Sequence, residues 1–332
     1  MFIDSFTFQD FLIQPKSRSR VKSRSQVDTS IKIGNLELNM PVVSASMSAF
    51  DTINPFSAEI DVNFAKALSN AGGMHILSRS ATFSNRFDAV QKLIENDYKV
   101  GMAVSLSEFN ENRYLLENTP AVISIDIANG AIIDDIEWES NWPLVVGNFA
   151  TPSVTTEVQR FRGNVIIKLG VGSGSACSTR VVTGVGYPQA GLVYDASRVS
   201  KLPIISDGGV SSVSDFTKAI ALGADIVMTG RLFAAAKETP WPTQVINGDF
   251  FKPYRGMASR EEKKTKKFVE GASGYVPYEE KTVQEIMYDL KDGLTSAMSY
   301  CDSFDLQEFQ YNASFVSSSS HHLESSVRLK QI

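Results

Sequence analysis

Eight short apolar runs rich in β-branched residues recur along the chain, and they constrain its fold more than any other feature. Their first residues lie 22 to 38 positions apart, and intervening segments such as residues 215–224 carry helical periodicity. Apolar strands joined by helices are typical of a parallel sheet covered on both faces, and eight such units predict an α/β fold of the (β/α)8 barrel type. A doubly wound sheet is the alternative, but it suits the even spacing less well. The expected strands are residues 41–44, 74–77, 99–104, 121–127, 143–148, 165–170, 203–206 and 225–230.

The chain of 332 residues fits one barrel, so we expect a single catalytic domain over residues 1–332 with a flexible serine-rich tail at about 312–332. The formal net charge of −5 indicates no polyanionic partner, although the basic run in residues 15–25 leaves a weak nucleic-acid alternative to a solvated loop. Two cysteines make no disulfide framework, and no apolar run approaches the ~20 residues that span a bilayer. We therefore expect a cytoplasmic protein with no membrane segment.

Glycines and polar residues follow the expected strands, at the barrel end where active sites lie. Gly208, Gly209 and Gly230 expose N–H groups suited to phosphate, although tight turns require glycine equally. Arg231 beside Gly230 favours the anion interpretation.

Two aspartates, Asp126 and Asp207, end the fourth and seventh expected strands. Helix caps and turns are the ordinary roles of such residues. Because both would face one cleft, the hydroxyl groups of a ribose are the simplest common explanation.

A cysteine, Cys177, lies in the glycine-rich stretch "GVGSGSACSTR" after the sixth strand. A lone thiol is most often a small buried apolar group, but here backbone dipoles favour a thiolate that attacks an electrophilic carbon. Thr179 and Arg180 follow at a spacing suited to orienting water or a leaving group. A Ser-His-Asp hydrolase is poorly supported because His75 is the single histidine outside the tail, and no metal-ligand spacing occurs.

Together these loops resemble the inosine monophosphate dehydrogenase and guanosine monophosphate reductase family. The shared motifs cover nearly the whole chain and include "FTFQDFLIQP", "PVVSASM", "IDIANG", "VVGNFAT", "PIISDGG", "GADIVMTG" and "YRGMAS". The cysteine loop ending in "TRVVTGVGYPQ" is the most specific of them. The resemblance implies an oxidoreductase that acts on a purine nucleotide and assembles as a homotetramer.

Four features are similar to the reductase branch of the family. Residues 78–100 leave no room for inserted regulatory modules, the "ANG" and "GYPQ" motifs match reductases, the flap at about 255–280 is short, and the Arg-Tyr pair of dehydrogenases is missing. This branch implies NADPH-dependent reductive deamination of GMP to IMP and ammonia. The alternatives are an IMP dehydrogenase without the insert, which converts IMP, NAD and water to XMP and NADH, and an inactive GMP-binding regulatory homologue.

The resemblance also implies a role for individual residues. Cys177 matches the nucleophile that bonds to the purine, and Thr179 with Glu270 matches the pair that protonates the departing ammonia. The carbonyl groups of Gly172, Gly174 and Cys177 match a site for a monovalent cation, K+. Substrate contacts are expected from Ser46, Ser175, Asp207, Gly208, Gly209, Gly230, Arg231, Gly256, Met257 and Ala258, and NADPH contacts from Ser23, Arg24, Arg79, Asp126, Ile127, Ala128 and Lys267.

The chain departs from the family pattern at several of these positions. Ser173 replaces the usual proline of the cysteine loop, and Arg231 replaces a small residue beside the phosphate. Residues 78–80 read "SRS" where reductases have "HKH". These departures concern the ligands more than the reaction type, so a modified guanine nucleotide is an alternative substrate.

Overall fold

The computed structural model describes residues 5–54, 59–154, 160–256 and 271–317, and their centre is a closed barrel of eight parallel strands. Neighbouring strands follow chain order around the barrel, and the last strand pairs with the first. All eight predicted strands are confirmed to within one residue at each end. They are β4 (Val42–Ser44), β5 (Met74–Leu77), β6 (Val100–Val104), β7 (Val122–Asp126), β9 (Leu144–Phe149), β11 (Val165–Leu169), β12 (Ile204–Asp207) and β13 (Ile226–Thr229).

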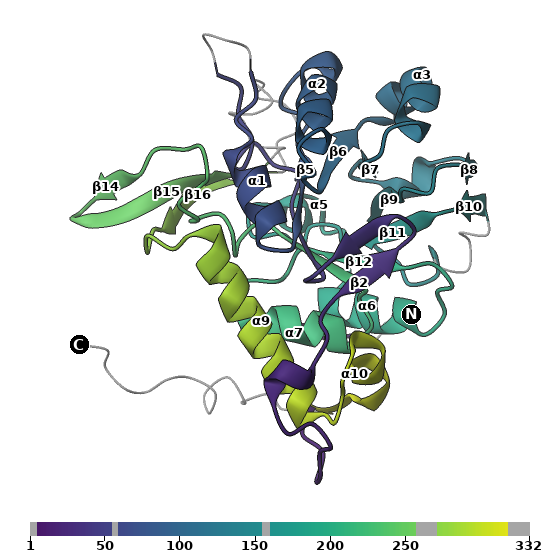
Figure 1. Cartoon of the computed structure of the whole chain (residues 1–332), viewed down its shortest axis with the longest axis vertical. Helices are drawn as coiled ribbons and strands as arrows, with labels where there is room; N and C mark the ends of the chain where they lie inside the picture. The colour runs from purple at the N-terminus through teal and green to yellow at the C-terminus, as the bar shows by residue number, and fades with distance from the viewer. Residues whose placement is uncertain (1–4, 55–58, 155–159, 257–270, 318–332) are drawn as a thin grey trace.

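Helices cover the outside of the barrel (Figure 1). Several strands are followed by a helix that begins with a polar capping residue, such as Thr82 before α2 and Ser212 before α7. Between β7 and β9, however, the described chain forms the short turn η2 (Gly130–Ile132) and the strand β8 (Ile136–Trp138), which pairs with β10 (Phe161–Gly163). The helices are α1 (Asn63–Asn70), α2 (Phe83–Ile94), α3 (Leu106–Glu117), α5 (Thr179–Thr183), α6 (Gln189–Ser197), α7 (Val213–Ala221), α9 (Val283–Tyr300) and α10 (Leu306–Asn312).

The segment between β5 and β6 contains only α2 as regular structure, so no module is inserted there. In the described residues no helix has the length and apolar character needed to cross a membrane.

The inside of the barrel is filled by side chains that alternate along the strands. Ile166 of β11 and Ile205 of β12 belong to the interior cluster, whereas Ile167 packs outward against the helix layer. Because side chains alternate with a period of two, Lys168 and Asp207 also point inward, one layer nearer the carboxyl ends of the strands. A hairpin of β2 (Ile31–Ile33) and β3 (Leu36–Leu38) contributes to the same interior cluster.

A three-stranded sheet projects from the side of the barrel in Figure 1. It consists of β14 (Gln244–Ile246), β15 (Asp249–Arg255) and β16 (Ser273–Pro277). The flap predicted at about 255–280 begins at the last residue of β15 and includes β16; residues 257–270 between them lie outside the described residues. From this sheet α9 runs back along the barrel and packs against α7.

The start of the predicted tail is ordered, contrary to our expectation for residues 312–317. Residues Ser314–Ser317 form β17, which pairs antiparallel with β1 (Phe11–Gln14) from the other end of the chain. Phe11 and Phe315 meet edge to face at 5.3 Å, and Phe6 adds a second such contact to Phe11 at 5.5 Å. This pairing joins the two ends of the described chain; residues 318–332 of the predicted tail lie outside it.

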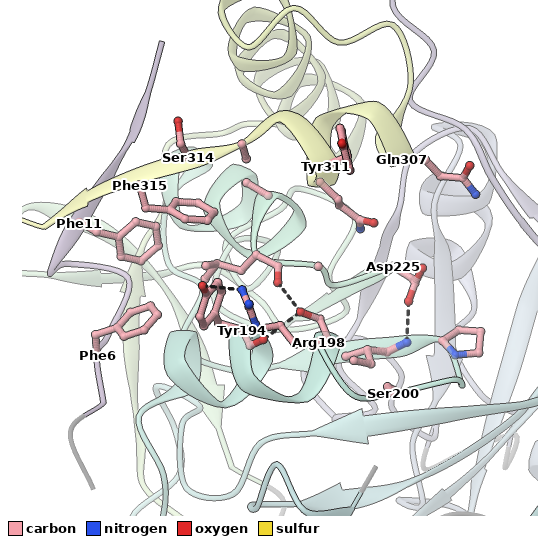
Figure 2. A pocket seen from close by; sticks show the side chains of 18 of the residues that line it. Phe6, Phe11, Tyr194, Arg198, Ser200, Asp225, Gln307, Tyr311, Ser314 and Phe315 are labelled. Carbon is pink, nitrogen blue, oxygen red and sulfur yellow. Dashed lines mark hydrogen bonds between the residues drawn. The ribbon is translucent and has the colours of Figure 1, made fainter. Parts of the chain in front are cut away.

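A cavity of about 1130 Å³ lies beside this pairing, at the end of the barrel where the strands begin. Figure 2 shows Phe6, Phe11 and Phe315 on one side of it and Arg198 and Asp225 farther along. Asp225 accepts a hydrogen bond from the Ile204 N–H group at 2.7 Å, so it holds the start of β12 in place. Burial raises the pKa of this carboxyl group.

We predict that Phe11→Ala lowers the free energy of unfolding by about 3–5 kcal/mol, as is usual when a buried phenylalanine is truncated. Phe11 is 3% exposed, and the Lys218 ammonium lies over its ring, 5.1 Å from the ring centre. Val316→Ala is the matched control, because Val316 lies on β17 but is 47% exposed; its effect should stay within about 0.5 kcal/mol. Urea unfolding followed by circular dichroism measures both, and equal losses would contradict the proposed packing.

Candidate active site

A cavity of about 460 Å³ opens at the carboxyl ends of the barrel strands. The loops after six of the barrel strands contribute to it, as the barrel architecture predicts. The cavity therefore gathers residues that are far apart in the sequence. Of the predicted site residues it is lined by Ser46, Arg79, Asp126, Ile127, Ala128, Gly172, Gly174, Ser175, Cys177, Thr179, Asp207, Gly208, Gly209, Gly230, Arg231 and Gly256.

The remaining predicted site residues are not in this cavity. Ser23 caps the short turn η1 (Arg24–Gln26), and η1 packs against α9 on the outside of the barrel. Neither Ser23 nor Arg24 lines the cavity of its own chain. Met257, Ala258, Lys267 and Glu270 lie outside the described residues.

The cysteine loop presents its thiol at the cavity surface. Cys177 is exposed, and its sulfur lies 3.2 Å from the Thr179 hydroxyl oxygen at the start of α5. The Cys177 N–H group donates to the Gly174 carbonyl at 2.9 Å, which closes the loop into a tight turn. The neighbouring Ala176 carbonyl accepts from Ala272 N–H at 2.9 Å. The thiol is thus held between the barrel and the β15–β16 sheet.

Arg180 does not reach the cavity, contrary to the expectation that it orients water or a leaving group. Its guanidinium donates to the Val171 carbonyl at 3.0 Å and to the Tyr187 carbonyl. Arg180 therefore joins the two ends of the cysteine loop. Burial lowers its pKa.

Glycine and a cation form one corner of the cavity, after β12 and β13. Gly208 has a φ of +87°, and a Cβ atom there would lie 2.4 Å from the Ser173 hydroxyl oxygen, so this turn requires glycine. Ser173 itself donates to the Asp207 carbonyl at 2.8 Å, which ties the cysteine loop to β12. Arg231 lines the same corner and forms no ion pair within the described part of the chain. This corner is suited to an anion.

The hydroxyl group of Tyr254 also faces this corner. It lies so near Gly230 that a Cβ atom there would approach within 2.5 Å of the hydroxyl oxygen. Burial, together with the charge of Asp207, raises the pKa of Tyr254, so its hydroxyl is a neutral hydrogen-bond donor for an anion.

A buried lysine connects the two aspartates that end β7 and β12. The Lys168 ammonium lies 2.6 Å from Asp126 Oδ1 and 3.4 Å from Asp207 Oδ2, and the lysine is 1% exposed. Asp126 also accepts from the Ser46 hydroxyl at 2.5 Å, and Asp207 from the Asn148 amide at 2.6 Å. Two carboxylates, one ammonium and two neutral donors thus form one network under the cavity.

Burial and charge oppose each other in this network. Burial disfavours the charged form of Lys168, but the charges of Asp126 and Asp207 outweigh it and raise the pKa of the ammonium. Burial likewise opposes ionisation of Asp126, yet the charge and hydrogen bond of Lys168 hold its pKa below the ordinary value. The pKa of Asp207 is raised by burial and by Asp126, which Lys168 and Asn148 only partly offset. The two carboxyl groups therefore have pKa values shifted in opposite directions.

Sequence reasoning missed Lys168, Asn148 and Tyr254 as residues of the cavity. The signal for Lys168 was present, because a lysine inside the run "VIIKLG" must be buried with its neighbours. Gly147 on the adjacent strand leaves room for the Lys168 side chain, because a Cβ atom at Gly147 would lie 2.7 Å from the Lys168 Cβ atom. Asn148 keeps a buried Oδ1 atom without a partner among the described residues.

A serine, a histidine and an aspartate do meet elsewhere in the barrel. His75 contacts the Ser44 hydroxyl at 2.5 Å and Asp51 Oδ2 at 3.3 Å. All three are at most 1% exposed, so no substrate reaches them. Asp51 instead accepts from the Ser78 hydroxyl at 2.5 Å, and so anchors the segment that carries Arg79 into the cavity.

Comparison with known proteins decides the family. Residues 5–328 match the family model described as IMP dehydrogenase / GMP reductase domain. The chain belongs to this family. It is 31% identical over 324 residues to a GMP reductase of Streptococcus pyogenes, with 93% of this chain and 94% of the relative covered. A GMP reductase of Lactococcus lactis is 32% identical over 319 residues, covering 91% and 92%, and one of Streptococcus gordonii is 32% identical over 312 residues, covering 91% of each.

Membership of the IMP dehydrogenase / GMP reductase family identifies the chain as an oxidoreductase and confirms the resemblance drawn from its loops. The strand-end cavity has the same cysteine loop and aspartates on which that resemblance was based.

We predict that Asp126→Asn destabilises the fold at pH 7, because the Lys168 ammonium then keeps one carboxylate partner instead of two. Since the pKa of Asp126 is lowered in the folded state, its stabilising effect is present above its ordinary pKa of ~3.9 and is lost as the pH falls through the folded-state value. Urea unfolding of both proteins between pH 7 and pH 3 should show the difference shrinking in acid. A difference that grows toward pH 3 would contradict this assignment.

Proposed function

We propose that this protein catalyses the NADPH-dependent reductive deamination of GMP, or of a closely related guanine nucleotide, to IMP and ammonia. The observation that carries the proposal is the exposed Cys177 thiol, whose sulfur lies 3.2 Å from the Thr179 hydroxyl oxygen. The same cavity contains the glycine and arginine corner suited to an anion, and two carboxylates, Asp126 and Asp207, that can accept hydrogen bonds from ribose hydroxyls. The relatives named GMP reductase support the same reaction. The overall change is GMP, NADPH and two protons to IMP, NADP+ and ammonium.

In the first step the Cys177 sulfur bonds to the purine carbon that bears the amino group. That carbon–nitrogen bond then breaks, and the leaving nitrogen takes a proton, which we assign to Thr179 acting with Glu270. The hydride that replaces the amino group comes from NADPH, and the carbon–sulfur bond breaks as the thiolate leaves. The short Cys177–Thr179 contact supports this assignment, since a proton donor must lie within hydrogen-bond reach of the reacting atoms.

The nucleotide phosphate is proposed to bind in the corner formed by Gly208, Gly209, Gly230 and Arg231, near the Tyr254 hydroxyl. Ribose hydroxyls would donate to Asp207, whose Oδ1 atom accepts no hydrogen bond from the described residues. Asn148 also lines the cavity, and its buried Oδ1 atom has no partner among the described residues.

We propose the opposite side of the cavity for the nicotinamide cofactor. Asp126 is a carboxylate for ribose hydroxyls, Ile127 and Ala128 provide apolar contact, and Arg79 offers a guanidinium that pairs with no described acidic side chain. We assign NADPH to this side. The carbonyl groups of Gly172, Gly174 and Cys177 are proposed for K+, and the assembly is proposed to be a homotetramer in the cytoplasm.

The decisive assay gives purified protein either GMP with NADPH or IMP with NAD and follows absorbance at the nicotinamide wavelength. We expect oxidation of NADPH with GMP, and Cys177→Ala should abolish it while binding of the nucleotide persists in calorimetry. Thr179→Val should slow turnover by about 10²–10⁴-fold. Activity only with IMP and NAD would overturn reduction in favour of the dehydrogenase reaction, and nucleotide binding without any turnover would favour an inactive homologue.

Arg231→Gln should raise the KM for GMP by about 10- to 100-fold with a smaller change in kcat, because a charge-assisted hydrogen bond to phosphate is worth about 1.5–3 kcal/mol. Arg198→Gln is the matched control, since Arg198 lines the cavity at the other end of the barrel. Steady-state kinetics at varied GMP measures both variants. An unchanged KM for Arg231→Gln would remove this residue from the phosphate site.

A further inference from the structure

The buried ammonium of Lys168 lies between the two halves of the proposed cavity. Its contact to Asp126 at 2.6 Å reaches the carboxylate on the cofactor side, and its contact to Asp207 at 3.4 Å reaches the carboxylate on the nucleotide side. The proposed reaction gives Lys168 no chemical step. Its contacts instead connect two carboxylates that would bind different ligands.

Each carboxylate also accepts a hydrogen bond from a second side chain that does not contact the other carboxylate. Ser46 donates to Asp126 Oδ2 at 2.5 Å, and Asn148 donates to Asp207 Oδ2 at 2.6 Å. Neither Ser46 nor Asn148 contacts both aspartates within the described residues. Lys168 is therefore the shared member of the network.

The surroundings of Lys168 allow it little other freedom. It is 1% exposed, and its Cβ atom and backbone carbonyl fill the space that a side chain at Gly147 would need. A buried ammonium that lost its carboxylate partners would be an unpaired charge away from water, which is strongly unfavourable. A shift of either aspartate therefore changes a contact of Lys168, which also contacts the other aspartate.

We propose that Lys168 is a positioning residue that couples the two ligands, so that occupation of the nucleotide side raises the affinity of the cofactor side, and the reverse. The proposal rests on the proposed function for the identity of the two ligands. A ribose hydroxyl bound to Asp207 fixes this carboxylate, Lys168 and Asp126 together, so the second ligand orders fewer groups when it binds. Linkage requires that the effect be the same in both directions.

The test measures binding without turnover. IMP and NADPH are both already reduced, so no hydride passes between them when they are bound together. Calorimetry gives the Kd of NADPH without IMP and with saturating IMP, and the Kd of IMP without and with NADPH. We expect each ligand to tighten the other by at least about fivefold in the unmodified protein, and by less than about twofold in Lys168→Gln.

A matched control separates coupling from plain loss of affinity. Arg79→Gln removes a cation from the cofactor side but no hydrogen bond of the Lys168 network. It should weaken NADPH binding and leave the coupling factor within about twofold of its original value.

Lys168→Gln leaves two carboxylates beside an uncharged side chain and is therefore at risk of not folding. Asp126→Asn, and Lys168→Gln combined with Asp126→Asn, remove the same bridge with less unpaired charge. In both variants, the factor by which IMP tightens the binding of NADPH should be near one.

Three results would overturn the coupling. They are a factor near one in the unmodified protein, a factor preserved in Lys168→Gln despite weaker binding of both ligands, or a factor preserved in Asp126→Asn. If the unmodified protein binds neither IMP nor NADPH, the proposed function fails as well, whereas binding of both without coupling overturns the role of Lys168 alone.

Discussion

The site depends on one buried ionic network, in which a lysine on β11 contacts carboxylates at the ends of β7 and β12. The network exists because side chains alternate along each strand, so Ile166 and Ile205 fix which positions face the barrel interior. Because Lys168 and Asp207 both face inward at the same level, their opposite charges attract and they form an ion pair. An apolar residue in place of Lys168 would leave Asp126 and Asp207 to repel each other.

The position of the Cys177 thiol depends on a different set of constraints, all of them within or beside its loop. Arg180 joins the two ends of the loop, Ser173 ties it to β12, and the Ala176 carbonyl ties it to the chain before β16. Ser173 is the residue that departs from the usual proline. The Ser173 hydroxyl donates a hydrogen bond to the Asp207 carbonyl, which a proline side chain cannot do. In this chain the serine therefore provides a connection between the loop and the barrel.

Much of the architecture could be read from the sequence, because continuous β-branched runs and capped helices are local signals. The paired strands β1 and β17 were not foreseen, since serines near the end of a chain form a strand only when a distant partner is present. Many of the residues that line the cavity were predicted from the family motifs and from strand ends, yet the motifs say nothing of which side chains touch. Arg180 shows this well: its position in the loop suggested chemistry, whereas its hydrogen bonds show a structural role.

The pairing of β1 with β17 also decides where additions to the protein are tolerated. Phe6 and Ser317, near the two ends of the described chain, line the same cavity where the barrel strands begin. Cys177 lies after the other ends of these strands. A surface tether or a fused reporter protein attached through this region would lie at the end of the barrel opposite the Cys177 cavity, so the immobilised protein would keep that cavity open.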